Sequence, residues 1–416
     1  MTLKTALLHY AAPPVIGGVE AVLLAHARQF VQAGMPIAVI AGSGVTSALP
    51  EGCEFIQIPE MDTRHPEILQ LSAALEHGQV PAEFEALTQR VTDALRPVVI
   101  RYDRLLVHNV LTKHFNLPLT AALFRLMDEG AARGVTAWCH DLTWSSPTSR
   151  NKVFDAYPWN LLRTARPDVS YVAVSMQRQK EAAETFGMPL DKVRVIYNGV
   201  DQQMLLGISP ETSALADRLG IWDADLVVLM PVRVTRAKNI EYALEMMAAM
   251  KRSSCQARLV VTGPPDPHDA GGGSYYQELR VLRRRMDLEQ ELRFVYESGP
   301  DPAQPYQIDQ SSVADLLRLS DLMFMPSHHE GFGMPVLEAG LAGVPVVTTA
   351  VPAALEIALE DAFVFSLNTS PDLLVEQLLN WIEENSQYQL RRRVRRDFTW
   401  KAIFQRDIKP LLEGGR

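Results

Sequence analysis

The chain has 416 residues, of which 47% are hydrophobic and 21% charged, as expected for a soluble globular protein long enough to form two domains. Its net charge of −9 argues against a nucleic-acid-binding surface. The three cysteines form no Cys-x-x-Cys pair, so we expect reduced thiols and a cytoplasmic protein. No apolar run approaches about 18 residues, so we expect no membrane span. Lys4 interrupts the short apolar run near the start, so we expect no signal peptide.

The N-terminal part alternates between strand and helix patterns. We predict a strand over 5–9, a helix over 19–33 and a strand over 36–41. Such alternation indicates a parallel sheet with right-handed crossovers. Gly17 and Gly18 stand in the loop just before the helix. They either let the backbone close over a diphosphate or an acceptor, or form a tight turn.

Two later strands of this part end in polar side chains. One ends in His108 and Asn109, and the other ends in His140 and Asp141. Because open α/β sheets bind ligands at the carboxyl ends of their strands, these four residues are candidates for ligand contact. The turn over 198–201 then leads out of the first domain.

The second part repeats the alternation. A strand over 226–230 is followed by a loop that carries Arg233 and Lys238, and then by a helix from about residue 240. Two cations between a strand end and a helix start are suited to neutralise the charge of a departing nucleoside diphosphate. The alternative is a pair of solvated loop cations.

A glycine-bearing stretch follows the apolar run 322–325, which we predict to be a buried strand. Gly331 and Gly333 would let the backbone approach a ligand closely, and Pro335 is suited to the first turn of a helix. We expect free N–H groups near Met334 to Leu337, and such groups at a helix start attract phosphate. Glu330 lies just before this helix and Glu338 one turn inside it, so the two carboxylates can address opposite ends of a nucleotide-sugar.

This stretch resembles the Glu-x7-Glu signature of retaining GT-B glycosyltransferases of the group 1, or family-four, type. The matching residues are Glu330, Gly331, Phe332, Gly333, Pro335, Glu338, Ala339, Gly343 and Pro345. The resemblance implies an α/β protein of the GT-B class, with two Rossmann-like domains facing across a cleft. It implies an acceptor-side domain over 1–200, a nucleotide-sugar-binding domain over 201–385, and a final helix over 386–416 that packs back on the first domain.

The resemblance also implies roles for individual residues. The expected catalytic residues are Glu330, His140, Arg233 and Lys238. The expected donor-binding residues are Gly17, Gly18, Gly263, Pro264, Val295, Tyr296, Gly331, Phe332, Gly333, Met334, Pro335, Val336, Leu337 and Glu338. The expected acceptor contacts are His108, Asn109 and Asp141. Glu338 would bind the ribose, and Glu330 and His140 the donor sugar, with no metal and no cofactor besides the nucleotide-sugar substrate.

The implied reaction transfers a hexose from a UDP-, GDP- or ADP-sugar to a hydroxyl of a carbohydrate or small-molecule acceptor, with retained anomeric configuration. A nucleotide-sugar epimerase and a non-catalytic nucleotide-sugar binder of the same fold are the alternatives. One departure from the family pattern is Val351-Pro352-Ala353-Ala354, where relatives often carry a Gly-Gly pair. The basic run Arg391–Arg396 is interpreted as a solvated helix face, with weak contact to an anionic membrane surface as the alternative.

Overall fold

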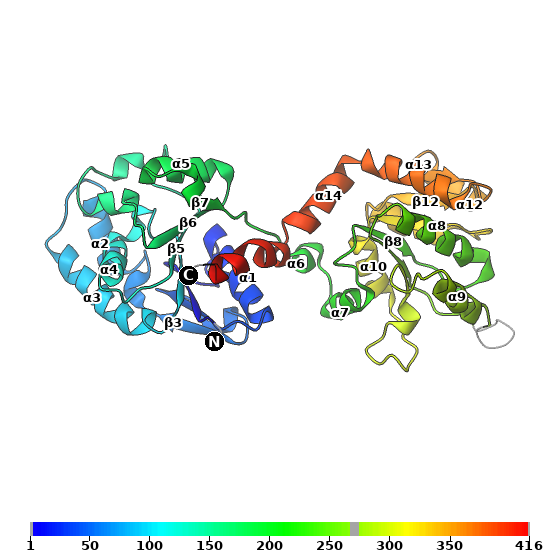
Figure 1. The fold of residues 1–416 in the computed structure, drawn as a ribbon, viewed down its shortest axis with the longest axis horizontal. Coiled ribbons are helices and arrows are strands. Elements are labelled where there is room, and N and C mark those ends of the chain that lie inside the picture. The colour runs from blue at the N-terminus through cyan, green and yellow to red at the C-terminus, as the bar shows by residue number, and fades with distance from the viewer. Residues whose placement is uncertain (1–2, 267–273, 415–416) are drawn as a thin grey trace. The chain divides into compact units, whose positions relative to one another are not determined.

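The computed structural model describes residues 3–266 and 274–414. The chain forms two compact units, one comprising Met1–Val200 and Phe398–Arg416 and the other comprising Asp201–Asp397. Each unit is a parallel sheet covered by helices (Figure 1). The predicted α/β class with two Rossmann-like domains is therefore confirmed.

The first unit contains a seven-stranded parallel sheet in the order β3-β2-β1-β4-β5-β6-β7. Its strands are β1 (Thr5–Leu8), β2 (Ile37–Ala41), β3 (Cys53–Gln57), β4 (Arg104–His108), β5 (Val135–Cys139), β6 (Val169–Ala173) and β7 (Val193–Val195). Its main helices are α1 (Gly18–Gln32), α2 (Pro66–Leu75), α3 (Glu83–Val99), α4 (Leu117–Asp128) and α5 (Met176–Phe186). The strand order reverses between β1 and β4, so the loops after these two strands border the position where such sheets bind ligands.

Apolar periodicity explains how the helices cover this sheet. The buried face of α1 carries Leu23, Ala27 and Phe30, which pack with the C-terminal residues Ile403 and Phe404 against one side. Buried residues of α2, α3 and α4 form the core on the other side. The chain end that completes the first side contains α15 (Trp400–Ile403), a π-helical turn (Phe404–Ile408) and α16 (Lys409–Glu413).

The second unit contains a six-stranded parallel sheet in the order β10-β9-β8-β11-β12-β13. Its strands are β8 (Leu226–Met230), β9 (Ala257–Val261), β10 (Leu292–Phe294), β11 (Leu322–Met325), β12 (Val346–Thr349) and β13 (Phe363–Phe365). Its helices are α6 (Gln202–Leu206), α7 (Pro210–Leu219), α8 (Ile240–Arg252), α9 (Ser274–Arg285), α10 (Gln310–Leu319), α11 (Met334–Leu341), α12 (Pro352–Ala358), α13 (Pro371–Glu383) and α14 (Ser386–Asp397). The order reverses between β8 and β11, which places the loops carrying Arg233, Lys238 and Glu330 at this reversal.

The last segment differs from its sequence-based expectation. We expected residues 386–416 to pack together on the first domain, but α14 lies in the second unit and only the residues from Phe398 onward lie in the first. The guanidinium groups of Arg391 and Arg395 bind Asp321, whose side chain is fully buried. The basic run is therefore partly a packing surface of the second unit, because two of its cations are bound to a buried carboxylate.

The loops after β8 and β9 are held together through Gly263. A Cβ atom at this position would lie 2.4 Å from the Val232 carbonyl oxygen and 2.7 Å from the Arg233 Cα, both backbone atoms. We therefore expect Gly263→Ala to lower the free energy of unfolding by about 1–3 kcal/mol through overpacking. Gly331→Ala is the matched control, since a Cβ there would meet nothing within 4 Å. Equal urea midpoints for the two variants would contradict this prediction.

Candidate functional site

The side chain of Glu330 is held by two partners at the carboxyl end of β11. Lys238 Nζ lies 2.6 and 2.7 Å from its two carboxylate oxygens. The Ser327 hydroxyl donates a third hydrogen bond of 2.6 Å to the same carboxylate. The Glu330 side chain is only 6% exposed and that of Lys238 20% exposed, so solvent screens this ion pair weakly. The loops after β8 and β11 are thereby joined by a charged contact.

Main-chain and hydroxyl contacts fix the loop that carries Glu330. The His328 N–H donates to the Ala237 carbonyl at 2.9 Å. The Thr349 hydroxyl, at the end of β12, donates to the Ser327 carbonyl at 2.6 Å. Sequence reasoning did not single out Ser327 or Thr349. The short spacing from Ser327 to Glu330 is the one sequence feature that could have indicated their hydrogen bond. Thr349 lies far along the chain and contacts this loop because β12 is the neighbouring strand of β11.

Arg233 is an exposed cation of the same loop pair. Its side chain is exposed and has no ion-pair or hydrogen-bond partner within residues 3–266 and 274–414. Two hydrogen bonds tie the flanking backbone to the loop after β9, since the Gly263 N–H donates to the Val232 carbonyl and the Val234 N–H to the Pro264 carbonyl, both at 3.0 Å. Lys238 is already paired with Glu330, so Arg233 adds a positive charge that is not paired among the described residues.

The helix start after Glu330 has the expected geometry, with one correction. Gly333 adopts a φ of 90° as the N-cap of α11, a conformation that suits glycine. Pro335 lies in the first turn and has no N–H. We expected free N–H groups from Met334 to Leu337, but the Val336 N–H donates to the Gly333 carbonyl at 2.9 Å. The donors that remain for a phosphate are therefore fewer and lie nearer to Met334.

The other predicted donor contacts differ in accessibility. Phe332, Met334 and Leu337 have exposed side chains, and Glu338 is partly exposed. Val295 and Val336 are buried, so they can contact a ligand only through their main chain. The Tyr296 carbonyl already accepts a hydrogen bond from the Tyr306 N–H at 2.9 Å. The expected donor roles of these residues stay predictions.

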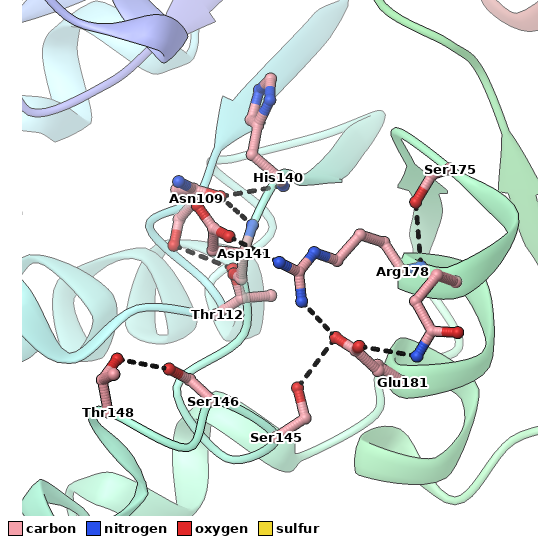
Figure 2. A network of polar contacts seen from close by, with 11 residues as sticks. Asn109, Thr112, His140, Asp141, Ser145, Ser146, Thr148, Ser175, Arg178 and Glu181 are labelled. Atoms are coloured by element: carbon pink, nitrogen blue, oxygen red, sulfur yellow. Dashed lines mark hydrogen bonds and ion pairs between the residues drawn. The ribbon is translucent and has the colours of Figure 1, made fainter.

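In the first unit, Asn109 organises the end of β5. It has a φ of 62°, and its Oδ1 accepts hydrogen bonds from the backbone N–H groups of His140 (2.9 Å) and Asp141 (3.1 Å). Figure 2 shows Asp141 lying beside Arg178, whose Nη2 is 3.2 Å from Asp141 Oδ1. Arg178 also pairs with Glu181, a polar neighbour that the sequence analysis did not identify. The Asp141 side chain is half-exposed, so it stays a predicted acceptor contact.

The expected acceptor contact by His108 is wrong for this structure, because this residue has no exposed surface. Its Nδ1 lies 3.1 Å from His140 Nε2 instead. Its carbonyl accepts a hydrogen bond of 2.9 Å from His9 Nδ1. His108 is thus a partner of His140 and not a surface residue.

The two glycines before α1 have different surroundings. A Cβ at Gly17 would lie 2.1 Å from a carboxylate oxygen of Glu20, whereas a Cβ at Gly18 would meet nothing within 4 Å. Glu20 lies in the first turn of α1, and its Oε1 is 3.7 Å from His9 Nε2. A carboxylate therefore already lies at this helix start, which makes the position less favourable for a diphosphate.

Burial lowers the pKa of His26 and of His140 to about 3. The folded state then binds fewer protons than the unfolded state below about pH 6.5, so stability is retained above that pH and lost as the pH falls. Each such histidine contributes up to about 1.4 kcal/mol per pH unit in this window. We expect His26→Phe to flatten the dependence of the urea midpoint on pH between about pH 7 and 5. An unchanged slope would contradict the burial of His26.

Two further properties concern metals and membranes. Within the part of the chain that the structure describes, no group of three or more His, Cys, Asp or Glu residues is arranged to hold a metal ion. None of the described helices has the length and apolarity needed to cross a bilayer.

Two family models match this chain, one for each unit. The model for glycosyl transferases group 1 matches residues 213–397, and the model for glycosyltransferase family 4 matches residues 16–203. The first match contains the Arg233, Lys238 and Glu330 cluster, and the second contains His140.

Individual proteins are similar over part of the chain. An uncharacterized glycosyltransferase of Methanocaldococcus jannaschii is 29% identical over 45% of this chain and 43% of its own length. Mannosylglucosylglycerate synthase of Petrotoga mobilis is 26% identical over 59% of each chain. The matched part of the chain thus spans about half the length of these relatives.

A crystal structure of a glycosyltransferase from Rickettsia africae is 16% identical, with coverage of 99% of this chain and 98% of that one and a TM-score of 0.38. A score this low supports no conclusion, so the assignment rests on the family models and the two sheets. The two parts of the chain thus match two families of glycosyltransferases, and these matches together with the two Rossmann-like sheets support the GT-B fold.

Proposed function

We propose that this protein is a retaining, metal-independent glycosyltransferase that moves a hexose from a nucleotide-sugar to an acceptor hydroxyl. The observation that carries the proposal is the group of residues at the β8–β11 reversal, where Lys238 and Ser327 hold Glu330 and the side chain of Arg233 is exposed. A nearly buried carboxylate paired with Lys238, and an exposed Arg233 on the same loop as Lys238, suit a ligand that combines sugar hydroxyls with phosphates.

The proposed donor site assigns one task to each group. Arg233 and Lys238 bind the diphosphate, together with the N–H groups at the start of α11. Glu330 accepts hydrogen bonds from the sugar hydroxyls, and Glu338 from the ribose. This arrangement stabilises charge where the glycosidic bond breaks, which is the electrostatic task that limits such reactions.

The proposed transfer needs no protein nucleophile. The acceptor oxygen attacks the anomeric carbon from the face on which the nucleoside diphosphate leaves, and the leaving phosphate oxygen takes the acceptor's proton. The bond from the anomeric carbon to the phosphate oxygen breaks and the bond to the acceptor oxygen forms, so the configuration is retained. The two cations and the helix start supply the positive charge that stabilises the departing diphosphate, so the scheme requires no metal.

The test is turnover of UDP-, GDP- and ADP-hexoses with a panel of hydroxyl acceptors. We expect release of one nucleoside diphosphate that depends on an acceptor, and a product whose anomeric configuration, determined by NMR, equals that of the donor. Isomerisation of the donor without an acceptor would indicate an epimerase instead. Binding of a donor without any turnover would indicate a non-catalytic binder.

A further inference from the structure

The side chains of His140 and His108 contact each other at the carboxyl ends of β5 and β4. His140 Nε2 lies 3.1 Å from His108 Nδ1, and the two rings are nearly parallel, with centroids 5.4 Å apart. His108 is also stacked on Trp138 at 5.5 Å. Packing therefore holds the His108 ring in one orientation against His140.

Both rings are neutral at ordinary pH. Burial lowers the pKa of His108 well below its usual value and that of His140 to about 3. A neutral imidazole carries one proton, so one nitrogen of the facing pair donates and the other accepts. The remaining two nitrogens decide which arrangement is present.

The second nitrogen of His108 settles the direction of the hydrogen bond. His108 Nε2 is buried and has no hydrogen-bond partner. A proton on Nε2 would leave a buried N–H without an acceptor, which is the rarer and costlier defect in folded proteins. His108 therefore carries its proton on Nδ1 and donates it to His140 Nε2.

The outward nitrogen of His140 follows from this direction. Because His140 Nε2 accepts, its proton lies on Nδ1. His140 Nδ1 has no hydrogen-bond partner and, unlike His108 Nε2, is not among the buried unpaired atoms of the described residues. His140 thus offers an N–H group toward solvent.

We propose that His108 is a positioning residue that fixes His140 as the neutral Nδ1–H tautomer, so that His140 binds a ligand as a hydrogen-bond donor to an oxygen. The identity of that ligand as a nucleotide-sugar rests on the proposed function. The tautomer itself does not, because it follows from contacts within the first unit. The ligand atom facing His140 is then an acceptor oxygen, such as that of a sugar hydroxyl or a phosphate.

The experiment is long-range ¹H–¹⁵N NMR of the full chain labelled on its histidine rings, with the His140 signals assigned from their loss in His140→Gln. We expect a protonated Nδ1 and an unprotonated Nε2 in His140 of the wild type. An unprotonated Nδ1 with a protonated Nε2 would overturn the proposal. The tautomer is read from the wild-type spectrum, the His140→Gln variant serves only to assign its signals, and no turnover is needed. A failure of the proposed function therefore does not change the result of this experiment.

Two variants of His108, which are isosteric with each other, test whether His108 determines the tautomer of His140. His108→Asn keeps an amide N–H near the former Nδ1, so His140 Nε2 should stay unprotonated. His108→Asp offers only acceptor oxygens when ionised, so the His140 proton should move to Nε2 at pH 8 or above. No such move in the Asp variant would overturn the role of His108. If only the Asn variant folds, a protonated Nε2 in that variant would overturn it.

His26→Asn is the matched control. The His26 ring also contacts His108, at a centroid distance of 5.4 Å, and lies 4.8 Å from Trp138, but it makes no hydrogen bond. The His26→Asn substitution therefore changes the packing of the same group of rings without removing a partner of the hydrogen bond between His108 and His140. We expect the His140 tautomer to be unchanged. A tautomer shift in this control would show that loosened packing alone moves the proton, and it would overturn the proposal.

Discussion

Lys238→Ala is expected to lower kcat for sugar transfer by about 10²–10³, as removal of one donor to a developing anion does in other enzymes. Lys238 is the cation that contacts both oxygens of the nearly buried Glu330. Its removal deletes a positive charge at the proposed diphosphate site and also leaves Glu330 with Ser327 as its remaining partner. The measurement is steady-state kinetics with the donor that the wild type turns over.

Lys251→Ala is the matched control for this variant. Lys251 lies at the other end of α8, is 41% exposed, and pairs with Asp287 and Glu291 at 3.0 and 3.1 Å. Its loss should leave kcat within about twofold of the wild type, because exposed ion pairs contribute little. Equal activities of the two variants, both shown to be folded, would rule out a catalytic role for Lys238.

Asp321→Asn is expected to lower the stability of the second unit by about 3–5 kcal/mol, the usual effect of breaking a buried ion pair. The carboxylate is 0% exposed, and its Oδ2 accepts from the Val227 N–H at 2.8 Å and from Arg395 Nη1 at 2.6 Å. The amide keeps the shape but removes the charge that balances Arg395 and Arg391. Hydrogen exchange over α14 in increasing urea would measure the loss.

Glu383→Gln tests whether any lost ion pair on α14 has this effect. Glu383 binds Arg392 at 2.6 Å, but both side chains are partly exposed, at 45% and 31%. Solvent screening should limit its effect to about 0–1 kcal/mol. If Asp321→Asn were no more destabilising than Glu383→Gln, α14 would not be held by the buried carboxylate.

Buried strands could be predicted closely from the sequence. The runs at 226–230 and 322–325 were predicted as strands and have these bounds in β8 and β11, because both faces of a central parallel strand are covered and the sequence is continuously apolar. Edge strands were harder to predict, because fewer of their side chains are buried and apolar. In β3 only Cys53 is buried, so its sequence lacks the apolar run, and the pattern did not predict it.

The contact between Lys238 and Glu330 could be anticipated because both residues follow their strands directly. Glu330 and Lys238 were predicted from the stretches after β11 and β8, and the structure brings them into contact. The packing of α14 could not be predicted in this way. Arg395 finds Asp321, 74 residues earlier in the chain, and no local pattern marks that pairing. The burial of His108 was missed because a histidine at a strand end looks the same whether it faces solvent or another histidine.

The most direct test of the account is thermal stabilisation by UDP-, GDP- and ADP-sugars, measured for the wild type, Arg233→Ala and Glu338→Ala. A ligand that binds only the folded protein raises its melting temperature in proportion to the logarithm of its concentration over Kd. We predict that one donor shifts the wild type by several degrees and that both variants lose this shift. The absence of stabilisation in the wild type, or equal stabilisation of all three proteins, would contradict the proposed donor site.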